Sequence, residues 1–153
     1  KYMKNIIIGK NSSISKHVHK NLKNSYVFSA NKLNKKYLLH KIKKYGKINL
    51  IFNNFYPSKN LNKLSHNDYK KFCELSLEKI SLIFQEIPSR KINKIIYTSS
   101  ASIYRISENL SHPKKDNFNR ELYSSFKLAA EKLIINYANK KKKEYFIMRL
   151  FNT

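Results

Sequence analysis

Short apolar segments alternate with longer amphipathic ones along this chain, and this alternation limits the possible folds more than any other feature. The apolar segments, which we expect to be strands, are 4–9, 25–29, 48–53, 92–98 and 145–150. The segments expected to be helical are 15–23, 34–45, 64–86 with an N-cap at Ser65, and 123–140. Strands that alternate with helices favour right-handed βαβ units and a parallel sheet. The sequence therefore predicts an α/β fold with a doubly wound, Rossmann-type sheet.

Glycine and polar residues follow several of these strands. Gly9 ends the first segment, Asn53 and Asn54 end the third, and a hydroxyl-rich turn of Thr98, Ser99 and Ser100 ends the fourth. In an open parallel sheet the ligand lies at the carboxyl ends of the strands. We therefore expect the functional site at this edge.

Length, cysteine content and charge narrow the class of protein. The 153 residues suit one domain, and no apolar run is long enough to span a bilayer. A single cysteine, Cys73, excludes a disulfide framework and fits a reducing, cytoplasmic compartment. The net charge of +23 comes almost wholly from lysines spread along the chain beside many asparagines and isoleucines, as in an AT-rich genome. Nucleic-acid binding is therefore not the preferred interpretation, although the charge attracts anionic ligands.

Tyr123 and Lys127 form the most chemically suggestive pair. They are four residues apart at the start of a segment expected to be helical, so both side chains lie on one face. An ammonium beside a phenol favours the phenolate, so we expect Lys127 to lower the pKa of Tyr123. A serine hydroxyl from the turn 98–100 would complete a proton-transfer site by bonding a substrate oxygen.

Four blocks in order resemble the extended branch of the short-chain dehydrogenase/reductase superfamily, the NAD-dependent epimerases and dehydratases. The blocks are 97–104 (YTSSASIY), the Tyr123-x-x-x-Lys127 pair, 128–133 (LAAEKL) and 149–152 (RLFN). The resemblance implies that Ser100, Tyr123 and Lys127 are the catalytic residues. It also implies a nicotinamide cofactor and a nucleotide-sugar substrate. In this family the substrate domain follows the last block, so we expect residues 1–153 to be a cofactor-binding domain that is incomplete at its C-terminus.

The cofactor loop departs from the family pattern Gly-x-x-Gly-x-x-Gly. Gly9 keeps the first glycine, while Ser12 and Ser15 occupy the second and third positions. The second glycine lets the backbone approach the pyrophosphate, and the third lets helix and strand pack closely. Each serine adds a Cβ, and its hydroxyl can cap the helix or bond a phosphate. We expect cofactor binding that is retained but weakened.

The acidic residue that binds the ribose in this family is also missing after the second strand. Ser29 and Asn31 stand there and are taken as cofactor-binding residues, with Lys32 beside them. Without a carboxylate a 2′-phosphate is not repelled, so NAD and NADP both remain open. Asn54 and Ser99 complete the residues implied to contact the cofactor, and ordinary turn chemistry is an equal explanation for Asn54. No histidine has metal-ligand spacing, so no metal is assigned.

The leading hypothesis is an NAD(P)-dependent epimerase, dehydratase or reductase of a nucleotide sugar, and homodimer formation is left open. The serine and alanine at positions 99 and 101 favour epimerase or reductase over dehydratase, because a dehydratase needs acidic residues there. The alternative is a degenerate module that keeps the fold for binding or scaffolding without catalysis. The altered loop and Phe126, where the family has a small residue, motivate this alternative. Polyanion binding is a third and weaker hypothesis.

Overall fold

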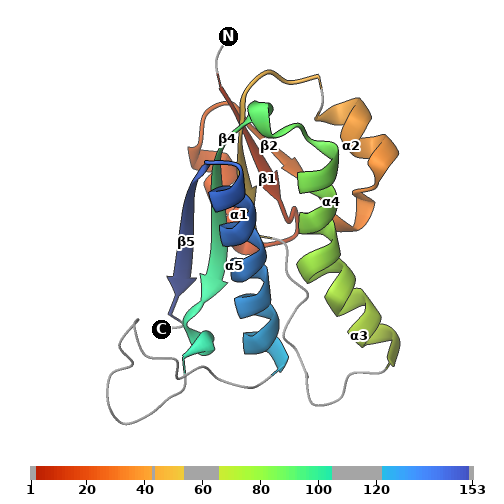
Figure 1. Cartoon of the computed structure of the whole chain (residues 1–153), viewed down its shortest axis with the longest axis vertical. Helices are drawn as coiled ribbons and strands as arrows, with labels where there is room; N and C mark the ends of the chain where they lie inside the picture. The colour runs from red at the N-terminus through yellow and green to blue at the C-terminus, as the bar shows by residue number, and fades with distance from the viewer. Residues whose placement is uncertain (1–2, 43, 54–65, 105–121, 152–153) are drawn as a thin grey trace.

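The computed structural model describes residues 3–42, 44–53, 66–104 and 122–151, and it contains the predicted alternation of strands and helices (Figure 1). The strands are β1 (Lys4–Ile8), β2 (Ser25–Phe28), β3 (Ile48–Phe52), β4 (Ile92–Ser100) and β5 (Glu144–Leu150). The α-helices are α1 (Ser13–Asn21), α2 (Lys35–Lys41), α3 (His66–Cys73), α4 (Lys79–Glu86) and α5 (Leu122–Lys140). Single 3-10 turns occupy Ala30–Lys32, Ser89–Lys91 and Ala101–Ile103.

The five strands form one parallel sheet in the order β2-β1-β3-β4-β5. The predicted doubly wound sheet is thereby confirmed. The order is that of the common Rossmann sheet without the outermost strand on the β2 side. The direction of strand addition reverses between β1 and β3, so the switch point lies beside Gly9, at the carboxyl ends of the strands.

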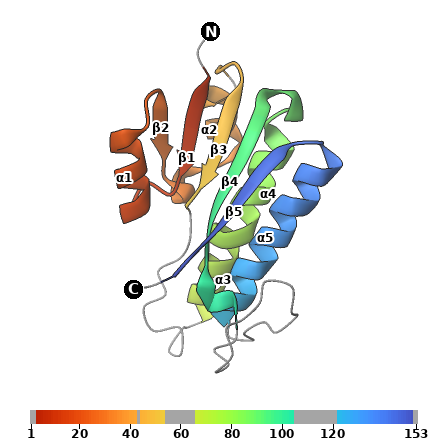
Figure 2. The same ribbon diagram turned by 90° about the vertical axis from the view of Figure 1, so that its left-hand side faces the viewer.

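Helices cover the two faces of the sheet unequally. Helix α1 packs on β1 and β2, whereas α2 contacts α4 and α4 contacts α5. Figure 2 shows α1 on one side of the sheet and the α4–α5 layer on the other. Right-handed crossovers produce this arrangement, because the chain adds β2 on one side of β1 and the later strands on the opposite side.

Isoleucines at the centre of the sheet account for its stability. Ile6, Ile7 and Ile8 are successive residues of β1 and are all fully buried. Successive side chains of a strand point to opposite faces, so both faces of β1 are covered. Burying one such side chain contributes about 1.5–3 kcal/mol. On the edge strand β5, by contrast, Phe146, Met148 and Leu150 remain 40–47% exposed.

The third predicted helix differs from the expectation in one respect. A π-helical segment, Glu74–Glu78, interrupts the helical rod between α3 and α4. The sequence pattern did not reveal this insertion, because a single wider turn hardly alters the apolar periodicity. The predicted N-cap Ser65 lies outside the described residues. Within the described ranges, no helix is both long and apolar enough to cross a membrane.

Candidate active site

The serine turn and the start of α5 are held together directly. Ser100 ends β4, and its Oγ accepts a hydrogen bond from the Ser102 backbone N–H at 3.2 Å. The Ser124 hydroxyl in the first turn of α5 donates to the Ser102 carbonyl at 2.7 Å. Two residues 22 apart in sequence are thus joined, and the bond fixes where α5 begins relative to the strand.

Tyr123 and Ser100 meet across this junction, as the sequence predicted. Tyr123 is half-buried, and its hydroxyl hydrogen-bonds that of Ser100. Burial raises the pKa of the Tyr123 phenol, because a phenolate loses hydration there. The hydrogen bond with Ser100 acts in the opposite direction and lowers the pKa. The two hydroxyls form a polar pair at the carboxyl end of β4.

Lys127 follows Tyr123 by one turn of α5 and is almost fully buried, with 5% of its surface exposed. Its Nζ donates to the Thr98 carbonyl at 2.9 Å. The Nζ also lies 5.1 Å from the Tyr97 ring centroid and 5.9 Å from that of Tyr123. Burial lowers the pKa of Lys127 to about 7, while the Glu131 carboxylate acts in the opposite direction. Both protonation states of Lys127 are therefore populated near neutral pH.

The prediction that the pKa of Tyr123 is lowered overall was wrong for this structure. The pKa of Tyr123 is raised, and burial is the largest cause. The spacing of the two side chains follows from the sequence, but the depth at which each is buried does not. Burial disfavours the charged form of both groups, so a neutral phenol and a partly neutral amine share the site.

A buried ion pair supports the base of the site. Glu131, one turn beyond Lys127, is 1% exposed. Arg149 of β5 donates to both Glu131 oxygens, at 3.0 and 2.7 Å, and also to the Tyr104 hydroxyl. A bidentate pair of this kind fixes geometry as well as charge. Arg149 therefore has a structural role, and it attaches β5 to α5.

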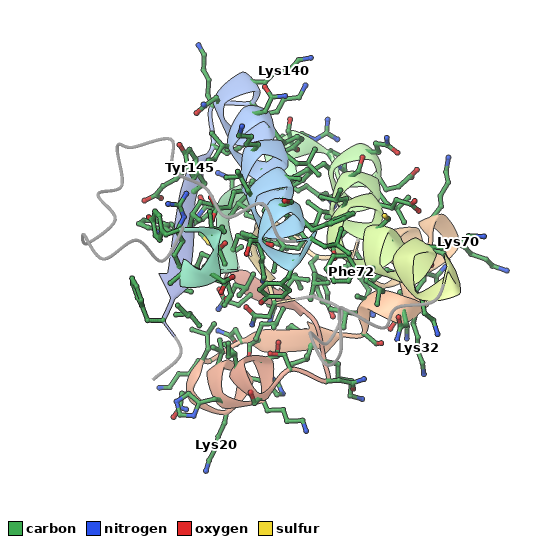
Figure 3. All side chains as sticks on the ribbon, turned by 90° about the horizontal axis from the view of Figure 1, so that it is seen from below. Lys20, Lys32, Lys70, Phe72, Lys140 and Tyr145 are labelled. Atoms are coloured by element: carbon green, nitrogen blue, oxygen red, sulfur yellow. The ribbon has the colours of Figure 1, made fainter. Side chains whose placement is uncertain are left out.

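Phe126, which stands where the family has a small residue, packs against a neighbouring helix. Its ring packs edge-on against Phe72 of α3, with centroids 4.8 Å apart and planes at 87°. Figure 3 shows Phe72 between α3 and α5. The bulky residue beside Lys127 thus contributes to helix packing.

The loop between β1 and α1 keeps the backbone shape that its single glycine provides. Gly9 has φ of 114°, a conformation that residues with a Cβ rarely adopt. The Gly9 and Lys10 N–H groups both donate to the Phe28 carbonyl, and Gly9 accepts from the Ser12 N–H. Helix α1 carries no acidic residue in its first turn, so its N-terminal dipole is available to an anion.

Ser12, at the second glycine position, caps α1. Its Oγ accepts from the Ser15 N–H at 3.4 Å. We expect Ser12→Ala to lower the free energy of unfolding by about 1 kcal/mol, the usual cost of a lost N-cap. Ser12→Gly should cost only a few tenths of that value. Urea unfolding of both variants checks this, and an equal loss for alanine and glycine would contradict the capping role.

Ser15, at the third glycine position, is fully buried. Its Oγ accepts from the Asn53 side-chain amide at 3.1 Å. Asn53 in turn accepts from the Thr98 hydroxyl. The Ser15 hydroxyl thus bonds the end of β3, and a contact of this residue with the cofactor stays a prediction. Ser15 therefore keeps the contact between α1 and the sheet that the glycine at this position allows in the family.

Ser29, Asn31 and Ser99, three further predicted cofactor residues, lie at the expected edge of the sheet. Ser29 and Asn31 follow β2, and Asn31 is exposed. Ser99 on β4 is 3% exposed, and its Oγ finds no hydrogen-bond partner within the described residues. A buried hydroxyl without a partner at a strand end is suited to a bound ligand. Asn54 lies outside the described residues.

Three contributors to the site were not predicted from the sequence, namely the Thr98 carbonyl, the Asn53 side chain and Glu131. A signal existed for each residue, since Asn53 and Thr98 end strands at the expected edge and Glu131 follows Lys127 by one helical turn, but none of their contacts was predicted. Among the described residues there is no group of histidine, cysteine and acidic side chains that could hold a metal ion.

The doubly wound sheet, the Gly9 turn and the grouping of Ser100, Tyr123 and Lys127 are the features that the resemblance to the short-chain dehydrogenase/reductase class implies. The model of the NAD dependent epimerase/dehydratase family matches residues 11–153. The chain belongs to this family.

Solved structures share its fold at low sequence identity. UDP-glucose 4-epimerase from Brucella ovis in complex with NAD superposes with a TM-score of 0.79 at 17% identity, covering 99% of this chain and 52% of that one. The Thermus thermophilus UDP-glucose 4-epimerase complex with NAD gives 0.79 at 13%, covering 96% and 54%. UDP-glucuronic acid 4-epimerase from Bacillus cereus in complex with UDP-glucuronic acid and NAD gives 0.74 at 15%, covering 96% and 56%. The chain thus spans about half the length of these proteins. No curated protein sequence matches it significantly.

Proposed function

We propose that this chain is the cofactor-binding part of an NAD(P)-dependent enzyme that oxidises and reduces a hydroxyl of a nucleotide-activated sugar. The observation that carries the proposal is the Ser100–Tyr123 hydroxyl pair above the buried Lys127, at the carboxyl edge of the sheet. Family membership supports it, because epimerases and dehydratases share an oxidation step at a sugar carbon.

In this proposal Tyr123 moves the proton. The Tyr123 phenolate accepts the proton of the sugar hydroxyl during oxidation, and the phenol so formed returns it during reduction, while Ser100 bonds the same oxygen. The Lys127 ammonium favours the phenolate and contacts the cofactor ribose. Because the pKa of Lys127 is lowered to about 7, the strength of this effect depends on pH near neutrality. A bound nicotinamide supplies the hydride acceptor and donor, which no side chain can provide.

The residues at the switch point fit a dinucleotide. The Gly9 turn and the N-terminus of α1 suit a pyrophosphate, and the Ser99 hydroxyl is buried at the adjoining strand end. The end of β2 offers Ser29, Asn31 and the exposed Lys32, with no carboxylate to repel a 2′-phosphate. NAD is favoured by the family, and NADP remains the alternative.

The similar solved structures support a substrate class. The similar solved structures include two UDP-glucose 4-epimerases with NAD and a UDP-glucuronic acid 4-epimerase with its sugar nucleotide. We infer a nucleotide-linked hexose, with epimerase or reductase chemistry preferred. The surplus of lysine would favour encounter with such an anion.

Titration with NADH and NADPH tests the proposal. We expect either cofactor to raise the melting temperature, because a ligand that binds only the folded state stabilises it by about 2.7 kcal/mol at a hundred times its dissociation constant. The effect of NADH should exceed that of NADPH if the family preference holds. ATP serves as the control for nonspecific anion binding. If neither cofactor changes the melting temperature, the non-catalytic scaffold becomes the better interpretation.

A further inference from the structure

Four elements of the site are connected by one buried chain of hydrogen bonds. The Asn53 amide donates to Ser15 Oγ on α1, and the Thr98 hydroxyl donates to Asn53 Oδ1 from β4. The Thr98 carbonyl then accepts from Lys127 Nζ on α5. The chain crosses the sheet from the α1 face to the α5 face, two layers that Figure 3 shows on opposite sides.

Each link in this chain is shielded from water. Ser15 is fully buried, and Asn53, Thr98 and Lys127 are 9%, 6% and 5% exposed. A buried amide or hydroxyl that loses its partner keeps its desolvation penalty, so each member constrains its neighbours. The described pairing of β3 with β4 ends at Phe52 and Tyr97, one residue before Asn53 and Thr98. The hydrogen bond between the Thr98 and Asn53 side chains thus connects β3 and β4 just beyond the last backbone pair.

We propose that Ser15 and Asn53 form a matched pair of positioning residues that connects the cofactor loop to the anchor of Lys127. This inference rests on the proposed function. The serine at the third glycine position is then not a mere loss of the family glycine. Its hydroxyl adds a specific bond with Asn53 to the helix–strand contact, and Asn53 orients Thr98, whose carbonyl fixes the lysine.

The cofactor arm of the test compares NADH affinities. Ser15→Gly restores the family glycine but removes the bond, and we expect it to weaken NADH binding about threefold to tenfold, as for one buried hydrogen bond. Asn53→Ala should weaken binding at least as much. The double variant should bind no more weakly than Asn53→Ala alone, because the link is already broken.

The second part of the test measures the environment of the Lys127 side chain by NMR, in the absence of cofactor. The ¹⁵Nζ resonance of Lys127, assigned by its loss in Lys127→Arg, should move in Asn53→Ala and in Thr98→Val. Thr98→Val keeps the carbonyl and the side-chain shape and removes only the hydroxyl. In Thr98→Ser, which keeps the hydroxyl, the resonance should have the same frequency as in the unaltered protein. Ile42→Val, a core change in the segment that follows α2 and outside the chain of hydrogen bonds, serves as the control for general loosening.

Two results would overturn the inference. The first is a Lys127 resonance that moves no further in Thr98→Val than in Ile42→Val. The second is NADH binding by Ser15→Gly that equals or exceeds that of the unaltered protein. If Asn53→Ala does not fold, the Thr98→Val and Thr98→Ser pair decides. If the unaltered protein binds no NADH, the proposed function fails, and the lysine resonance alone decides the inference.

Discussion

Replacing Tyr123 by phenylalanine should lower turnover of a nucleotide sugar by about a hundredfold to ten-thousandfold, the usual contribution of a positioned acid or base. The phenol is the proton carrier in the proposed reaction, and it is the group paired with Ser100. Phenylalanine keeps the ring, which lies near Lys127 Nζ, so the lysine environment changes little. The measurement is the steady-state rate with a panel of UDP-hexoses, together with NADH affinity, which should be retained.

Tyr137→Phe provides the matched control for this substitution. Tyr137 lies further along the same helix, where its ring stacks on Phe84 at 3.8 Å between centroids, away from the serine turn. The same loss of a hydroxyl there should leave turnover unchanged. Undiminished turnover in Tyr123→Phe would remove Tyr123 from the mechanism. Equal losses in both variants would indicate a general effect on folding.

The fold was largely predictable because its signals are local. Runs such as Ile6–Ile8 mark strands buried on both faces, and their alternation with amphipathic helices leaves few topologies. These local signals did not predict that β2 is the outermost described strand on its side of the sheet. Helix periodicity also does not register the π-helical turn Glu74–Glu78, which depends on packing against α5.

The site was predictable in its residue types but not in its energetics. The spacing of Tyr123 and Lys127 on one helix follows from periodicity, and the structure places Ser100 beside Tyr123. The depth of Lys127 and the bonds of Ser15 depend on residues distant in sequence. Asn53, for example, is 38 positions from Ser15 and 45 from Thr98. A pattern read along the chain could count the serines in the cofactor loop but could not show what they contact.

The buried amine of Lys127 predicts an unusual dependence of stability on pH. Its pKa in the folded protein is about 7, below the ordinary value of 10.5. Between these two values the unfolded chain binds the extra proton and the folded protein does not. The free energy of unfolding should therefore rise with pH through this window, by roughly 2 kcal/mol between about pH 7 and about pH 9. Urea unfolding at several pH values in this range measures the slope.

Lys127→Met should remove that slope, because methionine fills a similar volume and carries no proton. The variant should also be more stable than the unaltered protein at neutral pH, where protonating the buried amine opposes folding. Glu131 limits this gain, since its carboxylate stabilises the charged amine and is itself held by Arg149. Lys132→Met, an exposed lysine on the same helix, should keep the slope. A slope that persists in Lys127→Met would mean that another group is responsible.

Tyr97 and Tyr123 do not explain the slope, because their raised pKa values lie above this pH range. There they make the free energy of unfolding fall with rising pH, which is the opposite sign. A flat profile in the unaltered protein would mean that Lys127 stays charged, stabilised by Glu131 and the Thr98 carbonyl.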